Sequence, residues 1–401
     1  MAATAFCNIS NGYRITKISQ QNRIPALRKH SFVSTRQVEQ TTFSSYKWTQ
    51  KCLDKTLKCK AVLASAPAPA PVDEEVVGKI EEKEGGKVEE LSRETLIWRA
   101  IKLPMYTVAL IPVTVGSAAA YWQTGQFSML RYLMVLACYI IVNIWVNLSN
   151  DVYDFDTGAD KNKKESVINL FGSRTLINVL AWSALVLGSL GLTSVAVLAG
   201  NPRSIVLLAS AIFCFFLYQC PPFRLSYYGV GEPLLFLAYG PLSTIAFYLL
   251  HSRTSELAIS SVVVWSSVLV GLTTSLILFC SHFHQIEDDK AVGKISPLVR
   301  LGTEAGSNVV KASVIGLYAL VLALGFTGTL PLASVVLSCM TLPMGNAIVN
   351  FVQKNHKDKS KIFMGKYFCV RLHSAFGGAL AAGLVAARLF AKQQLPQALG
   401  I

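Results

Sequence analysis

Charged residues are scarce in this chain, and paired cysteine motifs are absent. Only 15% of its 401 residues are charged, whereas a soluble domain carries about 25%. The nine cysteines include no CxxC pair, so neither a zinc site nor a disulfide framework is indicated. The first 70 residues nearly lack acids, with only Glu39 and Asp54 against 11 Lys/Arg. Because much of the net charge of +14 lies in this segment, the composition gives no support for nucleic-acid binding.

Shifts in composition divide the chain into four parts. Residues 1–60 are rich in Ser, Thr, Gln, Lys and Arg and contain no apolar core long enough for a secretory signal. This composition predicts a chloroplast transit peptide, with a disordered basic tail as the alternative. Residues 61–95 form an Ala/Pro-rich and then Glu/Lys-rich linker. We expect a membrane domain over residues 96–392 and a short tail over residues 393–401.

Nine apolar runs are long enough to cross a bilayer as helices. They cover residues 104–122, 130–149, 176–199, 204–220, 231–250, 258–280, 310–329, 331–350 and 371–390. The loops after runs two, four, six and eight hold thirteen Lys/Arg, against Arg131, Arg203 and Arg253 in or beside the opposite loops. This asymmetry places those four loops on one side of the membrane. The sequence thus predicts an all-α polytopic membrane protein with nine transmembrane helices around a central cavity.

The segment NDVYDFDTGAD, residues 150–160, carries four carboxylates directly after the second apolar run. Asp151 and Asp154 share one face if the helix continues, because they are three residues apart. Carboxylates at the edge of a hydrocarbon layer suit Mg²⁺, especially when phosphate completes its shell. Lys164 and Arg174 follow in the same loop and could hold phosphate oxygens. An ordinary charged surface loop would explain the bases, but not two aspartates at the end of a span.

A second acidic segment, Glu287-Asp288-Asp289, follows the sixth apolar run on the same side of the membrane. We expect the two segments to face each other across a membrane-embedded pocket and to hold a diphosphate through Mg²⁺. His282 and His284 lie beside the second segment. A metal-binding or proton-transfer role for them is one interpretation, and helix capping or interfacial hydrogen bonding is the other.

Three separated motifs resemble the UbiA superfamily of intramembrane prenyltransferases. NDVYDFDTGAD is similar to the first aspartate-rich motif, most closely in the branch that prenylates 1,4-dihydroxy-2-naphthoate. PPFRLSYYGVGE (residues 221–232) resembles that branch's fourth loop, and SHFHQIEDDKAVGKISPLVRLG (residues 281–302) resembles its second motif. Many relatives have two aspartates four apart in the second motif, whereas this chain has Gln285 at the earlier position and Asp289 at the later one. The second metal would be held more weakly unless Glu287 or Asp288 compensates.

The resemblance implies a Mg²⁺-dependent chloroplast membrane enzyme with prenyl (phytyl) diphosphate and 1,4-dihydroxy-2-naphthoate as substrates and membrane lipids around it. Loss of the acceptor's carboxylate as CO₂ would accompany transfer, in the synthesis of phylloquinone (vitamin K₁), the quinone of photosystem I. The implied metal ligands are Asp151, Asp154, Asp160, Asp289 and Asp288. The implied catalytic cations are Arg300, Lys294, Lys164 and Arg174. The implied substrate-binding residues are Arg224, Asn150, Tyr153 and Tyr228, although Arg224 has an equal interpretation as a topology-setting arginine.

Two rival interpretations remain open. The first keeps the enzyme class and changes the acceptor to homogentisate or chlorophyllide. The second is a transporter that uses intramembrane acids as ion sites, which predicts acids near the bilayer midplane and not at the ends of spans beside Lys/Arg. The sequence does not decide between phytyl and other prenyl chains.

Overall fold

The computed structural model describes residue 100 and residues 102–159, 166–251 and 258–398, with side chains up to residue 391. Every regular element in these ranges is a helix. Nine of the helical segments are long and apolar enough to cross a membrane. The predicted all-α architecture with nine spans is therefore confirmed for the described residues. The expected transit peptide, the whole of the expected linker and the last three residues lie outside them.

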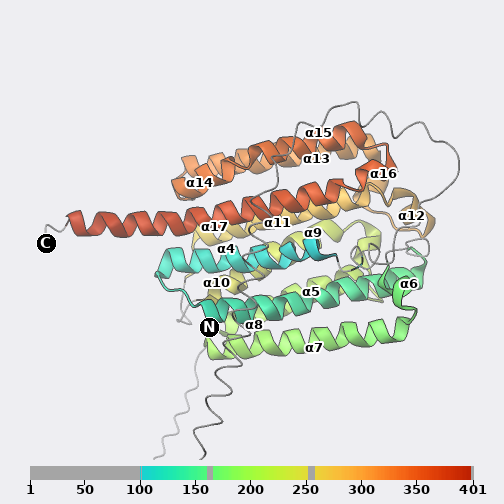
Figure 1. The fold of residues 1–401 in the computed structure, drawn as a ribbon, viewed down its shortest axis with the longest axis horizontal. Helices are drawn as coiled ribbons and strands as arrows, with labels where there is room; N and C mark the ends of the chain where they lie inside the picture. The colour runs from blue at the N-terminus through green and yellow to red at the C-terminus, as the bar shows by residue number, and fades with distance from the viewer. Residues whose placement is uncertain (1–99, 101, 160–165, 252–257, 399–401) are drawn as a thin grey trace, which may run out of the picture. The chain divides into compact units, whose positions relative to one another are not determined.

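The spans follow one another along the chain with short helices between them (Figure 1). They are η1 (Leu103–Tyr106) with α4 (Thr107–Thr124), α5 (Met129–Thr157), α7 (Arg174–Leu198), α8 (Pro202–Gln219), the continuous run of α9 (Gly231–Leu237), η3 (Ala238–Thr244) and α10 (Ile245–His251), α11 (Ser261–His282), α13 (Pro297–Phe326), α14 (Leu332–Cys339) with α15 (Leu342–Asn355), and α16 (Lys359–Ile362) with α17 (Gly365–Ala398). The connecting helices are α6 (Val167–Phe171), η2 (Leu225–Tyr228) and α12 (Ile286–Ala291).

Several spans extend further than the apolar runs predict, and two of them lie beside the acidic segments. Helix α5 continues past residue 149 to Thr157, because no helix breaker occurs before Gly158, whose φ of 84° ends the helix. Helix α13 begins at Pro297, where the Ser296 side chain accepts a hydrogen bond from the Val299 amide. Gly302, with φ 79° and ψ 167°, kinks α13 in its first turns. The extension of α5 sets Asp151 and Asp154 on helical backbone, and the second acidic segment lies on the separate short helix α12.

Small residues allow the central helices to approach closely. A Cβ atom on Gly240 of η3 would lie 2.7 Å from the carbonyl oxygen of Ser267 on α11. A Cβ atom on Gly271 would lie 2.8 Å from the carbonyl oxygen of Phe236. Real Cβ atoms do not tolerate such distances, so glycine at both positions lets α9, η3 and α11 pack backbone to backbone.

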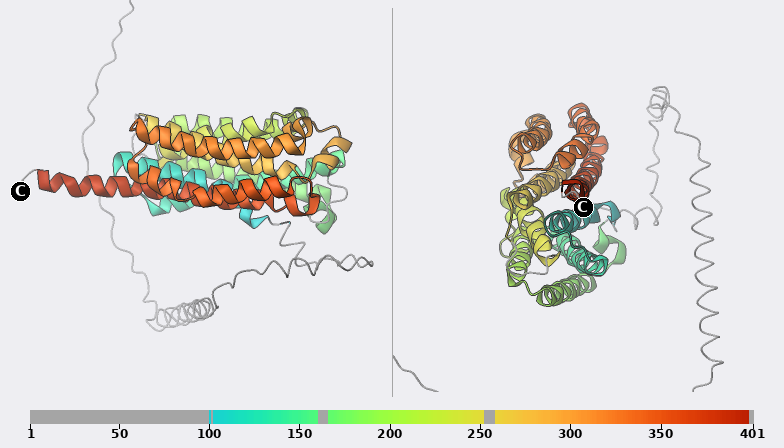
Figure 2. Two further views of the ribbon diagram at one scale, coloured as in Figure 1. Left: turned by 90° about the horizontal axis from the view of Figure 1, so that it is seen from above. Right: turned by 90° about the vertical axis from the view of Figure 1, so that its left-hand side faces the viewer.

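The short helices α6, α12 and α16 gather at one end of the bundle (Figure 1). Seen end-on, α7 lies at one edge and the α14–α15 pair at the opposite edge (Figure 2). The buried apolar residues form two main clusters, one centred on α4, α11, α13 and α17 and the other on α5, α8, η3 and α10. The loops predicted to share one side of the membrane are therefore at the same end of the helices.

Candidate active site

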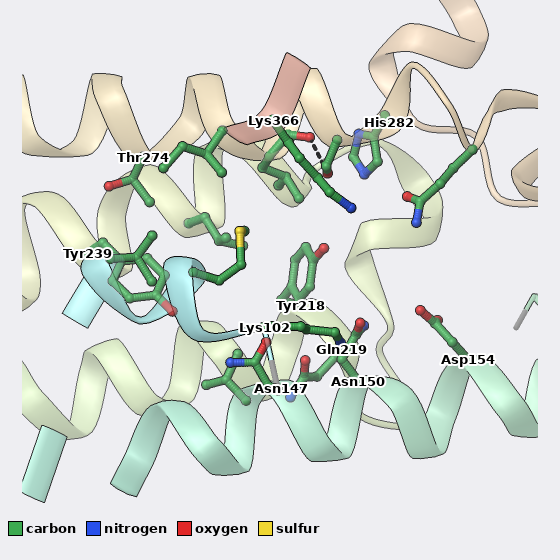
Figure 3. A pocket seen from close by; sticks show the side chains of 18 of the residues that line it. Lys102, Asn147, Asn150, Asp154, Tyr218, Gln219, Tyr239, Thr274, His282 and Lys366 are labelled. Atoms are coloured by element: carbon green, nitrogen blue, oxygen red, sulfur yellow. Dashed lines mark hydrogen bonds between the residues drawn. The ribbon is translucent and has the colours of Figure 1, made fainter. Parts of the chain in front are cut away.

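A cavity opens at the end of the bundle where the short helices gather (Figure 3). It encloses about 1210 Å³, part of it open to solvent. Its polar lining comes from spans that are distant in sequence: Lys102, Asn147, Asn150, Asp154, Tyr218, Gln219, Tyr239, Thr274, Ser281, His282, Gln285, Lys294, Lys366 and Tyr367. Val108, Val146, Leu235, Ile277 and Leu278 are among its apolar lining residues. The site thus combines a polar group of side chains with an apolar wall.

One face of α5 supplies Asn147, Asn150 and Asp154 to this cavity. These residues are three and four positions apart, so they lie on one side of the helix, and Figure 3 shows all three on the side that faces the cavity. Asp151 is next to them and is only 1% exposed. Its Oδ1 accepts a hydrogen bond from Lys102 Nζ at 2.7 Å, while its Oδ2 is buried and has no partner among the described residues.

The second acidic segment repeats this arrangement. Asp289 on α12 is 3% exposed, and its Oδ1 lies 3.2 Å from Lys294 Nζ. Its Oδ2 is also buried, with no hydrogen-bond partner in the part of the chain that the structure describes. The turn is closed by the Lys294 amide, which donates to the Asp289 carbonyl at 2.8 Å, and by Gly293 with φ 73°. Lys294 is thereby directed into the cavity lining.

Lys294 joins the two acidic segments electrostatically. Burial alone would lower the pKa of its ammonium group, but the carboxylates of Asp154 and Asp289 outweigh burial and raise that pKa above its usual value. Lys294 is therefore a permanent cation at neutral pH. It lies within electrostatic reach of carboxylates from both α5 and α12, so the two segments meet at one site.

The remaining acids of the second segment point elsewhere. Asp288 Oδ2 lies 3.0 Å from Lys359 Nζ on α16, and both side chains are exposed. Glu287 is exposed and lies 3.8 Å from Lys290. Gln285, the residue before α12, lines the cavity. The cavity therefore receives a neutral amide from this segment where the family pattern has an acid.

Two expected catalytic arginines lie outside the cavity lining. Arg174 forms a two-pronged ion pair with Asp156, with distances of 3.0 and 2.6 Å, near the surface. Arg300 donates to the Tyr228 carbonyl at 2.8 Å. Both hold neighbouring segments in place. Lys164 and Asp160, the remaining members of the predicted catalytic and metal-binding sets, lie outside the described residues.

Three expected substrate-binding residues are also outside the lining. Arg224 has φ 44°, and its guanidinium carbon lies 5.8 Å from the centre of the Tyr153 ring. Tyr153 packs among the apolar residues of α5 and its neighbours. Tyr228 is 63% exposed. Asn150 is the member of the predicted set that lines the cavity.

Comparison with known proteins places this arrangement in a family. Residues 109–374 match the UbiA prenyltransferase family. The chain belongs to this family. It is 59% identical over 303 residues to the protein of Arabidopsis thaliana named 2-carboxy-1,4-naphthoquinone phytyltransferase, chloroplastic, covering 75% of this chain and 79% of that one. It is 43% identical over 284 residues to the Synechocystis protein named 2-carboxy-1,4-naphthoquinone phytyltransferase, covering 71% and 91%.

A solved structure supports the fold of this UbiA-family chain. A UbiA homologue from Archaeoglobus fulgidus bound to DMAPP and Mg²⁺ has a TM-score of 0.52 and 15% identity, covering 73% of this chain and 99% of that one. At this identity the similarity establishes the fold alone.

Four side chains of this prenyltransferase add to the predicted site. Lys102 and Lys366 line the cavity from the start of the first span and the start of α17. Both lie on the basic side in the sequence, which is the signal that could have found them. The buried His282 lines the cavity and pairs with the partly buried Glu232. No spacing in the sequence links Glu232 to His282.

The donor set fits a divalent cation held together with phosphate. In the part of the chain that the structure describes, no three or more His, Cys, Asp or Glu side chains are grouped closely enough to hold an ion by themselves. However, Asp151 and Asp289 each have one buried carboxylate oxygen that no described residue partners, which is costly for an ionised group. A cation that takes one or two carboxylates and completes its shell with phosphate oxygens, as Mg²⁺ does, would satisfy both.

Proposed function

We propose that this chain is a Mg²⁺-dependent phytyltransferase in a chloroplast membrane. It transfers the phytyl group of phytyl diphosphate to the ring carbon that bears the carboxylate of 1,4-dihydroxy-2-naphthoate, whose oxidised form is 2-carboxy-1,4-naphthoquinone. The carboxylate leaves as CO₂, in a step of phylloquinone synthesis. The proposal rests mainly on the observation that Asp154, from the first acidic segment, and Lys294, beside the second, line one cavity. The names of the Arabidopsis and Synechocystis relatives support the choice of donor and acceptor.

The donor's diphosphate is bound at the polar mouth of the cavity. Asp151, Asp154 and Asp289 hold Mg²⁺, and Asp160 is a further candidate from the first segment, whereas Asp288, expected from the sequence as a ligand, pairs with Lys359 at the surface. Bound Mg²⁺ supplies positive charge that stabilises the leaving diphosphate. Lys294 and Lys102, each already oriented by an aspartate, add fixed positive charge at the same place. Arg174 and Arg300 act through the segments that they anchor.

The apolar wall accommodates the prenyl chain and excludes water from the allylic cation. Val108, Leu235 and Ile277 belong to this wall. Tyr218 and Tyr239 add aromatic faces to the lining, and the Tyr239 hydroxyl is held by donating to Asn143 Oδ1 at 2.6 Å. A dry, electron-rich surface lengthens the life of a carbocation, because water would otherwise capture it.

The acceptor enters beside the start of α17. Lys366 lines the cavity, and its Nζ lies 4.0 Å from the centre of the Phe363 ring. We assign the acceptor's carboxylate to Lys366, with the naphthalene ring against Phe363 and Tyr367. Arg224, expected from the sequence to take that carboxylate, is directed toward Tyr153 instead.

The test is a substrate panel on the full chain in detergent or nanodiscs. Phytyl, geranylgeranyl and solanesyl diphosphate are each combined with 1,4-dihydroxy-2-naphthoate, homogentisate or chlorophyllide, with Mg²⁺ or EDTA. We expect the phytyl–naphthoate pair to react fastest, with CO₂ release and complete loss of turnover in EDTA. Preferred transfer to homogentisate or chlorophyllide would contradict the proposal. Turnover without any transmembrane gradient separates an enzyme from a transporter.

A further inference from the structure

The cavity wall includes a buried histidine, His282, that pairs with the partly buried Glu232 behind it. His282 is the last residue of α11 and is 2% exposed. Its Nδ1 lies 3.1 Å from Oε1 of Glu232, in the first turn of α9. The other carboxylate oxygen, Oε2, is buried and finds no hydrogen-bond partner within the described ranges. A carboxylate in this position is expensive unless it is paired, so its presence beside the reaction cavity needs an explanation.

The pairing with Glu232 determines which ring nitrogen of His282 can accept a proton. An ionised carboxylate only accepts hydrogen bonds, so the proton of a neutral imidazole stays on Nδ1, toward Glu232. The second nitrogen, Nε2, then carries a lone pair that can accept a proton. His282 lines the cavity, and Figure 3 shows its ring near Lys366. This is the arrangement of a general base that is oriented by a carboxylate.

The pair is not required simply to join α9 to α11. Ser275 Oγ on α11 already donates to the Glu232 carbonyl at 3.2 Å. The glycine contacts of α9 and η3 with α11 add close backbone packing. A hydrophobic pair of similar size would join the helices without burying a charge.

We propose that His282 takes the proton from the acceptor's ring hydroxyl next to the carboxylated carbon, with Glu232 as its positioning residue. The acceptor therefore reacts in its 1,4-dihydroxy form and not as the quinone. This inference rests on the proposed function and specifies the oxidation state that the same site accepts. An electron-rich diol ring is a nucleophile toward an allylic cation, whereas the quinone ring is electron-poor.

The steps balance without another reactant. The ring carbon that bears the carboxylate forms a bond to the allylic carbon as the carbon–oxygen bond to diphosphate breaks, and the hydroxyl proton moves to Nε2 of His282. The product of this step is a ketone with a carboxylate on the neighbouring carbon. Its carbon–carboxylate bond then breaks, CO₂ leaves, and the electron pair returns to the ring oxygen. The imidazolium gives the proton back, so the product is the prenylated diol and His282 is neutral again.

The experiment compares three acceptors on the full chain in nanodiscs: the diol, its 1-methyl ether and its 4-methyl ether. General-base catalysis contributes about 10²–10⁴-fold, so wild type should turn over the 1-methyl ether at least ~10²-fold more slowly than the diol. The 4-methyl ether is the matched control and should react within ~3-fold of the diol, because its 1-hydroxyl is free. Competitive inhibition by each ether verifies that it binds.

His282→Asn and His282→Gln separate a catalytic role from a structural one. The Asn amide can replace Nδ1 toward Glu232 but not Nε2, and the Gln amide can reach the cavity but cannot take a proton. Both should lower kcat on the diol ~10²-fold, leave the acceptor KM within ~3-fold and abolish the preference for the diol over the 1-methyl ether. Glu232→Gln should lower kcat ~10-fold with unchanged acceptor KM, as expected for loss of orientation alone. Mg²⁺-dependent binding of phytyl diphosphate should be unchanged in all three and serves as the control for folding.

The possible results separate the inference from the proposed function. If wild type transfers phytyl to no naphthoate acceptor, the proposed function fails, and this inference with it. If wild type is active and His282→Asn keeps more than half of its turnover, or loses turnover equally on the diol and its 1-methyl ether, only the inference fails. Direct prenylation of the quinone under oxidising conditions, without reductant, also overturns the inference alone.

Discussion

The acidic segments on α5 and α12 are far apart in the chain but are built alike. Each has one buried aspartate that pairs one oxygen with a lysine, while the other oxygen has no partner among the residues described: Asp151 with Lys102, and Asp289 with Lys294. Each also has one more exposed aspartate in an ion pair away from the cavity lining: Asp156 with Arg174, and Asp288 with Lys359. The repeated pattern distinguishes aspartates that have a carboxylate oxygen available for a cation from aspartates that form ion pairs at the surface.

The segments differ in what they add to the cavity itself. Helix α5 adds the carboxylate of Asp154, whereas the second segment adds the neutral amide of Gln285 and the ammonium group of Lys294. Negative charge is therefore concentrated on the α5 side, and His282, Lys294 and Lys366 lie among the lining residues contributed from beyond α10. We expect α5 to be the stronger metal-binding side and the second segment to contribute more to phosphate binding.

The largest effect should separate inner from outer aspartates. Asp154→Asn or Asp289→Asn should lower kcat about a thousandfold, because removal of one preorganised charge at a reacting centre costs up to ~4 kcal/mol. Asp156→Asn and Asp288→Asn are matched controls one or two residues away. Because exposed ion pairs contribute about 0–1 kcal/mol, these controls should stay within ~5-fold of wild type. The measurement is phytyl transfer at saturating substrates in each variant.

A large loss in Asp156→Asn or Asp288→Asn would contradict the inner–outer distinction. Such a loss would indicate that these side chains move into the metal site when the substrate binds. Thermal unfolding of each variant in the same detergent distinguishes such a role from a loss of stability.

The sequence predicted the helices and both acidic segments because their signals are local. Length and hydropathy were sufficient to identify the nine apolar runs. Helical geometry was sufficient to predict that Asp151 and Asp154, three residues apart, share one face. Both Asp288 and Asp289 were expected as metal ligands, since the burial of Asp289 and the exposure of Asp288 depend on how α12 packs. Spans were also placed too short where polar residues continue a helix, as in α5 after residue 149.

Local sequence patterns could not predict which distant parts of the chain contribute side chains to the cavity. Lys102 and Lys366 enter the cavity from the two ends of the membrane domain, and Glu232 meets His282 across two spans. Positive charges near the motifs, Arg174 and Arg300, were expected to be catalytic because of their position in the sequence. In the fold they face Asp156 and the Tyr228 carbonyl.

An intermediate effect should distinguish the two aspartate–lysine pairs. Lys294 and Asp289 are both buried, whereas the Lys102 side chain is 21% exposed beside the buried Asp151. Removal of one partner from a buried pair leaves an uncompensated charge, so Lys294→Met should destabilise the protein by about 3 kcal/mol. Lys102→Met should cost less, because water reaches that pair. Thermal unfolding in one detergent, with and without Mg²⁺, measures both, and equal losses would show that the pairs are equivalently buried.

The smallest effect tests the asymmetry at Gln285. A carboxylate at this position would add a charged oxygen ligand to the cavity beside Lys294, where the chain now offers a neutral one. Since the number of charged ligands tunes affinity for hard cations, Gln285→Asp should lower the Mg²⁺ concentration for half-maximal turnover about tenfold, equivalent to ~1.4 kcal/mol. Gln285→Asn is the matched neutral control and should not lower it. If Gln285→Asp leaves the Mg²⁺ requirement unchanged while Asp154→Asn abolishes turnover, then only the α5 side holds the ion, and the second segment serves the phosphate through Lys294.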